Sequence, residues 1–87
     1  MSKQKIRDIY KVFANKNRVK LIVCLSQEKS VTELLEYCML SQSALSQHLK
    51  ILKDEGVALC TRDGKKQLYH IKDKKIIKLA QLLLELE

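Results

Sequence analysis

The segment 41–54 carries four uncharged polar side chains whose spacing lets them act together: Gln42, Ser43, Ser46 and Gln47. Positions i, i+1, i+4 and i+5 fall on one face of a helix. Glutamine hydrogen-bonds well to the N6/N7 edge of adenine, and serine can donate or accept, so such a face could read bases in a major groove. The alternative is a solvated helix surface, which more often carries Glu/Lys pairs because serine is a mediocre helix former. We favour base reading.

Two groups of basic side chains follow this polar set. Lys50 and Lys53 would continue the same helix and suit contacts to a sugar-phosphate backbone. Arg62, Lys65 and Lys66 surround an Asp-Gly pair, where a two-stranded projection could carry them to an adjacent minor groove or backbone. The alternative for this tip is a solvated turn that prevents edge aggregation.

The chain is basic overall, with 17 Lys+Arg against 10 Asp+Glu and a formal net charge of +7. The excess is concentrated in residues 1–20 and 50–78, whereas the stretch 21–49 is slightly acidic. A polyanion is the simplest partner for two basic regions in so small a protein. Charge kept only for solubility is the alternative.

The first 55 residues are predicted to be helical, because proline is absent and both glycines, Gly56 and Gly64, come later. A first helix is expected from an apolar stripe formed by Ile6, Ile9, Tyr10 and Phe13. Three further helices are expected to begin after the N-cap candidates Asn15, Ser30 and Ser41. Ser30 and Glu33 form a capping-box pattern. The third helix should run from Val31 to about Cys38, and the fourth should end near Gly56.

After Gly56 the pattern changes to two short strands around Asp63-Gly64, a dipeptide typical of a hairpin turn. The segment 73–87 is helical again, with Asp73 as its N-cap candidate. Its apolar residues cover more than one stripe, which indicates a subunit interface. The predicted fold class is mainly α with a β-hairpin wing, in the order α-α-α-α-β-β-α.

These elements make one domain, 1–87, with the architecture of a winged helix-turn-helix. Residues 31–54 form the helix-turn-helix and residues 57–71 form the wing. Residues 1–14 and 73–87 are expected to be dimerisation helices, so that the protein is a homodimer. A domain of this size often gains stability from a partner subunit.

Three cysteines, Cys24, Cys38 and Cys60, lie far apart without a CxxC motif, which suggests a reducing compartment. They are the candidate redox residues. For Cys24 and Cys60 the favoured alternative is a small core residue, and nothing near Cys38 in the sequence obviously lowers its pKa. The longest apolar run is Leu21–Leu25, so we expect a soluble, cytoplasmic protein without a membrane partner.

The string Leu40-Ser-Gln-Ser-Ala-Leu-Ser-Gln-His-Leu49, with Leu52, Gly56-Val57, the Asp63-Gly64 wing and Tyr69, resembles the ArsR/SmtB winged-helix repressors. The resemblance covers nearly the whole chain. It implies that Gln42, Ser43, Ser46 and Gln47 read bases, that the wing contacts the minor groove, and that the first and last helices form the dimer interface. It also implies that His48 supports the helix or a phosphate contact.

The chain departs from the metal-sensing members of that family. Leucines stand near Glu33-Leu34-Leu35 where a Cys-x-Cys pair is needed, and the last helix has no histidine. We therefore expect no metal and no cofactor. The string SQSALSQHLK is similar to the persulfide- and redox-sensing branch, which pairs a cysteine on the second helix with one on the last. Cys24 is on the correct helix, but no cysteine follows Cys60, so a thiol switch would need Cys38, Cys60 or a second subunit.

The resulting hypothesis is a transcriptional repressor that binds double-stranded DNA at an inverted repeat. An alternative is a winged-helix protein-interaction module without specific DNA readout. An enzyme has little support, because the histidines and cysteines form no nucleophile–base set and there is no glycine-rich phosphate loop. The effector is left unassigned.

Overall fold

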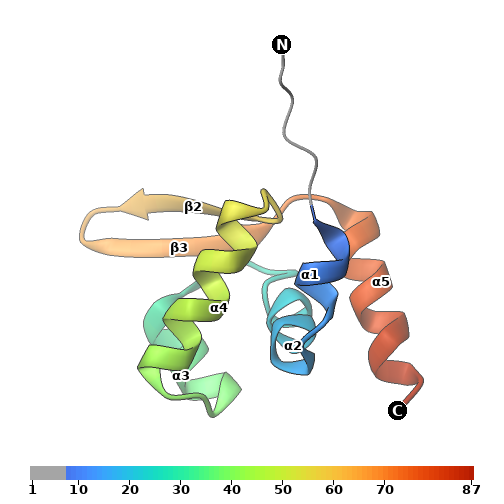
Figure 1. Cartoon of the computed structure of the whole chain (residues 1–87). Coiled ribbons are helices and arrows are strands. Elements are labelled where there is room, and N and C mark those ends of the chain that lie inside the picture. Colours follow the sequence, from blue (N-terminus) through green and yellow to red (C-terminus); the bar gives the residue numbers. More distant parts are fainter. Residues whose placement is uncertain (1–7) are drawn as a thin grey trace.

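The computed structural model describes residues 8–87, which form helices packed together and a hairpin that projects from them (Figure 1). In chain order the elements are α1 (Ile9–Phe13), α2 (Lys16–Cys24), β1 (Lys29–Ser30), α3 (Val31–Cys38), α4 (Gln42–Asp54), β2 (Ala58–Asp63), β3 (Lys66–Ile71) and α5 (Lys74–Glu85). The β2–β3 hairpin extends on the side of α4 that faces away from α5 (Figure 1).

The core lies where α2 meets the other helices and the base of the hairpin. Leu21, Ile22 and Leu25 of this region are fully buried. The other buried members of this cluster come from all the helices and from the base of the hairpin: Val12, Val19, Leu34, Leu45, Leu49, Leu52, Val57, Ala58, Ile71, Ile76 and Ala80. Every helix therefore contributes to one core, which fixes the helix-turn-helix relative to the hairpin.

Side-chain caps begin the helices at the predicted positions. Asn15 Oδ1 accepts from the N–H groups of Asn17 and Arg18, and Asp73 accepts from Lys75. Ser30 and Glu33 form the predicted capping box. The Ser30 N–H donates to Glu33 Oε1 at 2.8 Å, and the Glu33 N–H donates to Ser30 Oγ at 3.2 Å. These contacts satisfy N–H groups that the first turn leaves without helical partners.

The end of α4 is set by Gly56, which has a φ of 73°. Its N–H bonds to the carbonyl of Lys53, and the N–H of Val57 bonds to Leu52. This is the Schellman arrangement, in which glycine accepts the left-handed backbone without a Cβ clash. The predicted glycine C′ position is confirmed, and it releases the chain into the hairpin.

The hairpin belongs to a three-stranded antiparallel sheet of order β1-β3-β2. Lys29 and Ser30 of β1 pair with Tyr69 and Leu68 of β3. The sequence pattern did not predict β1. Two residues are too short to show an alternating pattern, so only the tertiary pairing reveals β1. The strand attaches the start of α3 to the wing.

Two local expectations need correction. The hairpin turn is centred on Gly64-Lys65, because Asp63 pairs with Lys66 and Gly64 carries the positive φ of 65°. Glycine at the first central position is the requirement of a type II′ turn. In α1, the buried residue is Val12, whereas Tyr10 of the predicted apolar stripe is 89% exposed. Ile6 of that stripe lies outside the described residues.

Candidate nucleic-acid interface

The outward face of α4 carries the four predicted base-reading residues. Ser41 begins the helix, its Oγ accepting from the N–H of Ala44 at 3.1 Å. Gln42, Ser43, Ser46 and Gln47 are all exposed. The opposite side of the helix is anchored by Leu45, Leu49 and Leu52 in the core. A rigid, buried leucine face thus holds a polar face outward at the N-terminal half of α4, where backbone N–H groups also favour anions.

The basic residues of α4 are also exposed, but one of them already has a partner. Lys50 Nζ forms an i,i+4 ion pair with Asp54 Oδ2 at 3.0 Å. Such an exposed pair contributes little to stability, so a phosphate can replace the carboxylate. Lys53 lies in the last turn of the helix and is exposed.

The turn between α3 and α4 is tight. Met39 caps α3 in the left-handed conformation, with φ 50° and ψ 35°, and its side chain is 92% exposed. A left-handed residue outside glycine costs energy, and tertiary packing on both sides of the turn must hold it. Cys38 precedes Met39 and Leu40 follows it, and both of these side chains pack against the core.

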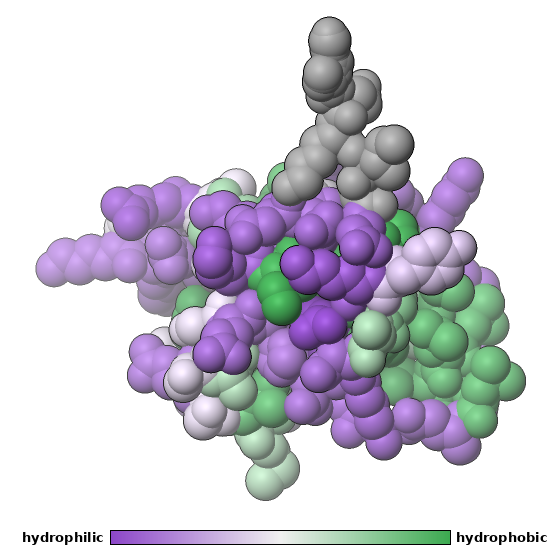
Figure 2. All heavy atoms as spheres, viewed as in Figure 1, coloured by the Kyte–Doolittle hydropathy of each residue, from purple (hydrophilic) through white to green (hydrophobic). Residues whose placement is uncertain are grey.

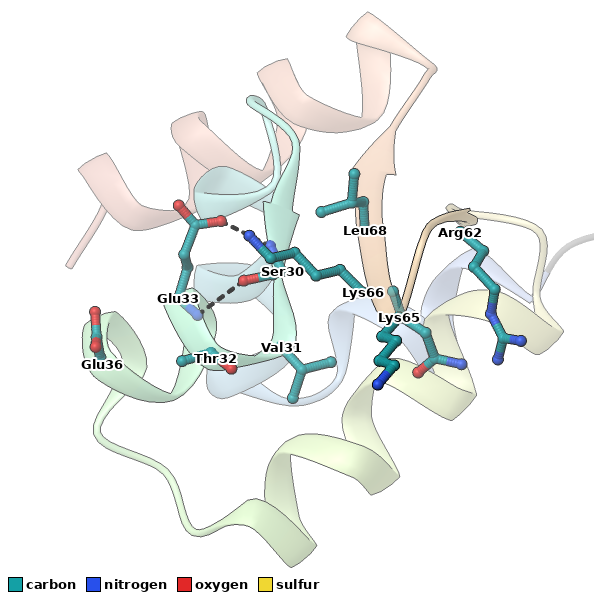
Figure 3. A pocket seen from close by; sticks show the side chains of 10 residues that line it. Ser30, Val31, Thr32, Glu33, Glu36, Arg62, Lys65, Lys66 and Leu68 are labelled. Atoms are coloured by element: carbon teal, nitrogen blue, oxygen red, sulfur yellow. Dashed lines mark hydrogen bonds between the residues drawn. The ribbon is translucent and has the colours of Figure 1, made fainter.

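The predicted wing residues Arg62, Lys65 and Lys66 are all exposed at the tip of the β2–β3 hairpin. A groove of about 630 Å³ separates this tip from the beginning of α3. Figure 3 shows Glu33 and Glu36 on the α3 wall of this groove and Arg62 and Lys65 on the wing wall, whereas the side chain of Lys66 extends from the wing toward Ser30 and Glu33. The hydrogen bond from the Ser30 N–H lowers the pKa of Glu33, and the charges of Lys29 and Lys66 act in the same direction.

Arg18 positions α4 relative to α1, and it was not among the site residues predicted from the sequence. It is 9% exposed and donates from Nη2 to the carbonyl of Lys11 at 2.8 Å and from Nε to Val12 at 3.2 Å. Its Nη1 lies 3.4 Å from Nδ1 of His48 on α4. Burial, and secondly the charge of Arg18, lowers the pKa of His48. Arg18 precedes the apolar run Leu21–Leu25 and stands among Lys16, Asn17 and Lys20, so its sequence context offers no signal of burial.

The structure brings two of the three cysteines together. Cys38 Sγ donates to Cys24 Sγ at 3.7 Å, and both side chains are half-buried. Cys60 lies on β2, where Tyr69 is its cross-strand partner. Burial raises the pKa of Cys38 to about 11, with the neighbouring Cys24 as a further cause. The proximity of Cys24 and Cys38 could not be read from a separation of 14 residues.

Within residues 8–87, no group of three or more His, Cys, Asp or Glu side chains has the arrangement needed to hold a metal ion. The same part of the chain contains no helix long and apolar enough to cross a membrane.

A helix-turn-helix with an exposed polar second helix, followed by a basic hairpin, defines a winged-helix DNA-binding protein. Residues 15–58 match the family model described as bacterial regulatory protein, arsR family, and the chain belongs to that family of DNA-binding transcriptional regulators. The predicted fold class and the predicted DNA-binding regulatory function are confirmed. These relationships do not favour the alternative of a protein-interaction module.

Individual relatives agree with this assignment. The chain is 32% identical over 72 residues to an arsenical resistance operon repressor of Staphylococcus aureus, covering 82% of this chain and 69% of that protein. The crystal structure of the transcriptional regulator HlyU from Vibrio vulnificus superposes with a TM-score of 0.78 at 35% identity, covering 90% of this chain and 82% of that one. The structure of reduced HlyU from Vibrio cholerae superposes with a TM-score of 0.78 at 33% identity, covering 90% of this chain and 83% of that one.

Proposed function

We propose that this regulator is a repressor that binds an inverted-repeat operator as a homodimer. The single observation that carries the proposal is the exposed face of Gln42, Ser43, Ser46 and Gln47, held outward by the buried leucines of α4. In the major groove, Gln42 and Gln47 would bond adenine edges while the two serines donate to or accept from neighbouring bases.

The basic residues have a separate role in this proposal. Lys50 and Lys53 contact the sugar-phosphate backbone beside the groove that α4 occupies, which positions the helix without reading sequence. Arg62, Lys65 and Lys66 bring the wing against the flanking minor groove or backbone. Phosphates of a DNA strand would approach the wing wall of the groove, which lies opposite the acidic α3 wall. The acidic Glu33 on the α3 wall is already engaged in the capping box, which keeps it directed at Ser30.

The dimer is proposed to form through α5 and the segment 1–14, of which residues 1–7 lie outside the described residues. Leu79, Leu82 and Leu86 follow one face of α5 and are 41%, 45% and 83% exposed. Figure 2 shows hydrophobic residues gathered on the side of the molecule where α5 lies, next to hydrophilic surface elsewhere. A two-fold interface through this face would cover it and present two α4 helices to one duplex.

We also propose that the regulator responds to thiol chemistry, as the resemblance to the persulfide- and redox-sensing branch suggests. The specific observation in favour is the Cys24–Cys38 contact at 3.7 Å. The pair differs from that branch, whose second cysteine lies on the last helix. Cys60 stays a candidate on the wing without a thiol partner assigned to it. Because the function is to bind chromosomal DNA, we propose the cytoplasm as the location and no enzymatic activity.

Selection of bound duplexes from a random pool tests the main proposal. We expect enrichment of a two-fold symmetric sequence with half-site centres about one helical turn, roughly 10 bp, apart. Sedimentation of the complex should give two protein chains per duplex. If no motif is enriched in moderate salt, the repressor assignment is contradicted. If a single half-site bound by one chain is enriched, the proposed dimer is contradicted.

A further inference from the structure

We propose that Cys24 and Cys38 form a dithiol that hydrogen peroxide converts to an intrachain disulfide, and that this bond weakens operator binding. The inference names a modification site for the thiol response and rests on the proposed DNA-binding function. Cys24 is the last residue of α2 and Cys38 the last of α3. Their sulfur atoms lie 3.7 Å apart. A disulfide bond of about 2.05 Å therefore requires the two sulfur atoms, and the helix ends that carry them, to move closer together.

The pair lies in the wall of a cavity of about 380 Å³. The other lining residues are Asn17 and Lys20 of α2, Val23, Tyr37, Met39, Leu40 and, from α5, Leu84. The lining combines apolar side chains with the cation Lys20, and the cavity is large enough to admit a small oxidant such as hydrogen peroxide.

The two sulfur atoms lie 3.7 Å apart and have different roles. Burial keeps Cys38 protonated at neutral pH because it raises the pKa of that thiol to about 11. Cys24 is accordingly the sulfur that attacks peroxide, and Cys38 is the resolving thiol.

The reaction proceeds in two displacement steps. The Cys24 thiol first releases its proton, and the thiolate attacks one peroxide oxygen, so that an S–O bond forms while the O–O bond breaks. The departing hydroxide takes up the released proton and leaves as water. Cys38 Sγ then attacks the sulfenic sulfur, the S–S bond forms while the S–O bond breaks, and the second water leaves with the Cys38 proton. Two thiols lose two electrons, and one peroxide is reduced to two waters.

The position of the pair connects its oxidation to DNA binding. Cys38 immediately precedes Met39, the left-handed residue of the turn that leads into α4. Drawing the end of α3 toward α2 moves this turn, and with it the N-terminal half of α4 that carries Gln42. Leu84 of the proposed dimerisation helix lines the same cavity, so the change also reaches α5. We expect operator affinity to fall within the range of about 5–150-fold that is usual for coupled sites.

The test combines intact mass with operator binding, on the full chain before and after hydrogen peroxide. Native protein and the control Cys60→Ser should each lose two hydrogens and form a Cys24–Cys38 cross-linked peptide, whereas Cys24→Ser and Cys38→Ser should not. Thermal melting checks that each variant folds, and Cys24→Ala replaces Cys24→Ser if that variant does not. Operator affinity should fall on oxidation only in native protein and Cys60→Ser, and should return with reductant.

The two levels of the proposal fail separately. A disulfide that includes Cys60, a disulfide between subunits, or unchanged mass in native protein would overturn the assignment of the pair. A Cys24–Cys38 disulfide with unchanged operator affinity would overturn its regulatory role. If the reduced protein binds no duplex in the selection described above, the repressor function fails, while the mass measurement still decides whether the dithiol forms its bond.

Discussion

Nη1 of Arg18 lies 3.4 Å from Nδ1 of His48, and this contact connects α4, which carries the proposed base-reading face, to the end of α1. The same guanidinium donates to the carbonyls of Lys11 and Val12 in α1. Because Arg18 has only donors, the contact requires His48 to accept at Nδ1, which is the neutral imidazole with its proton on Nε2. Protonation of His48 would place a second positive charge beside the buried guanidinium of Arg18.

Stability should therefore depend on the protonation of His48. Its pKa is lowered in the folded state, so between that value and the ordinary value of about 6.5 the unfolded chain binds more protons. The free energy of unfolding should fall as the pH drops from about 7.5 through this window. His48→Gln retains an acceptor for Arg18 and should flatten this part of the curve in urea titrations. Parallel curves for both proteins would contradict the prediction.

Local patterns in the sequence predict much of this fold, because each depends on neighbours within one turn. Ser30 with Glu33 and Gly56 with the end of α4 are such cases, and the structure confirms both. The hairpin was also predicted, but its turn is displaced by one residue because cross-strand pairing of Asp63 with Lys66 decides the register. A dipeptide signal alone does not contain that information.

Contacts between distant segments could not be predicted in the same way. Pairing of Lys29 with Tyr69 creates β1, and only the folded chain brings these residues together. The Arg18–His48 and Cys24–Cys38 contacts likewise join different helices. The exposed face of α4 was predictable, since its polar and leucine positions alternate with the helical period over one continuous segment.

Gln47→Ala tests base reading by α4. We expect it to weaken binding to the selected operator by about 1–3 kcal/mol while binding to random duplex changes little, because a lost base contact affects only the specific complex. Gln27→Ala, which alters an exposed glutamine in the turn after α2, is the matched control and should leave both affinities unchanged. Equal losses on operator and random DNA for Gln47→Ala would argue against base reading.

Lys66→Ala tests the wing. If Lys66 neutralises a phosphate, its removal weakens binding to all duplexes similarly and lowers the slope of log affinity against log salt by about 1. Lys78→Ala removes the same charge from an exposed position of α5, away from the wing, and should leave the slope as it is. The slopes are measured by fluorescence anisotropy across a salt series. An identical decrease in both variants would assign the effect to net charge alone.

Leu82→Glu tests the proposed dimer face on α5. Leu82 is 45% exposed in the single chain, and a carboxylate there would have to be buried without a partner in a symmetric interface. We expect the variant to sediment as a monomer and to lose operator affinity. Gln81→Glu adds the same charge at the adjacent exposed residue and should remain dimeric. A dimer of unchanged affinity for Leu82→Glu, verified as folded by circular dichroism, would exclude this face.

Ser41 and Ser43 separate the stability of α4 from its recognition role. Ser41 Oγ accepts from the Ala44 N–H at 3.1 Å, so Ser41→Ala should lower the free energy of unfolding by about 1 kcal/mol. Ser43 is exposed in the first turn of α4, and Ser43→Ala should change that free energy by less than about 0.5 kcal/mol. In operator binding we expect the opposite order. Ser43→Ala removes a proposed base contact and should lower the ratio of operator affinity to random-duplex affinity, whereas Ser41→Ala should leave that ratio unchanged. If Ser43→Ala instead destabilises α4 as strongly as Ser41→Ala and leaves that ratio intact, Ser43 supports the helix and does not read DNA.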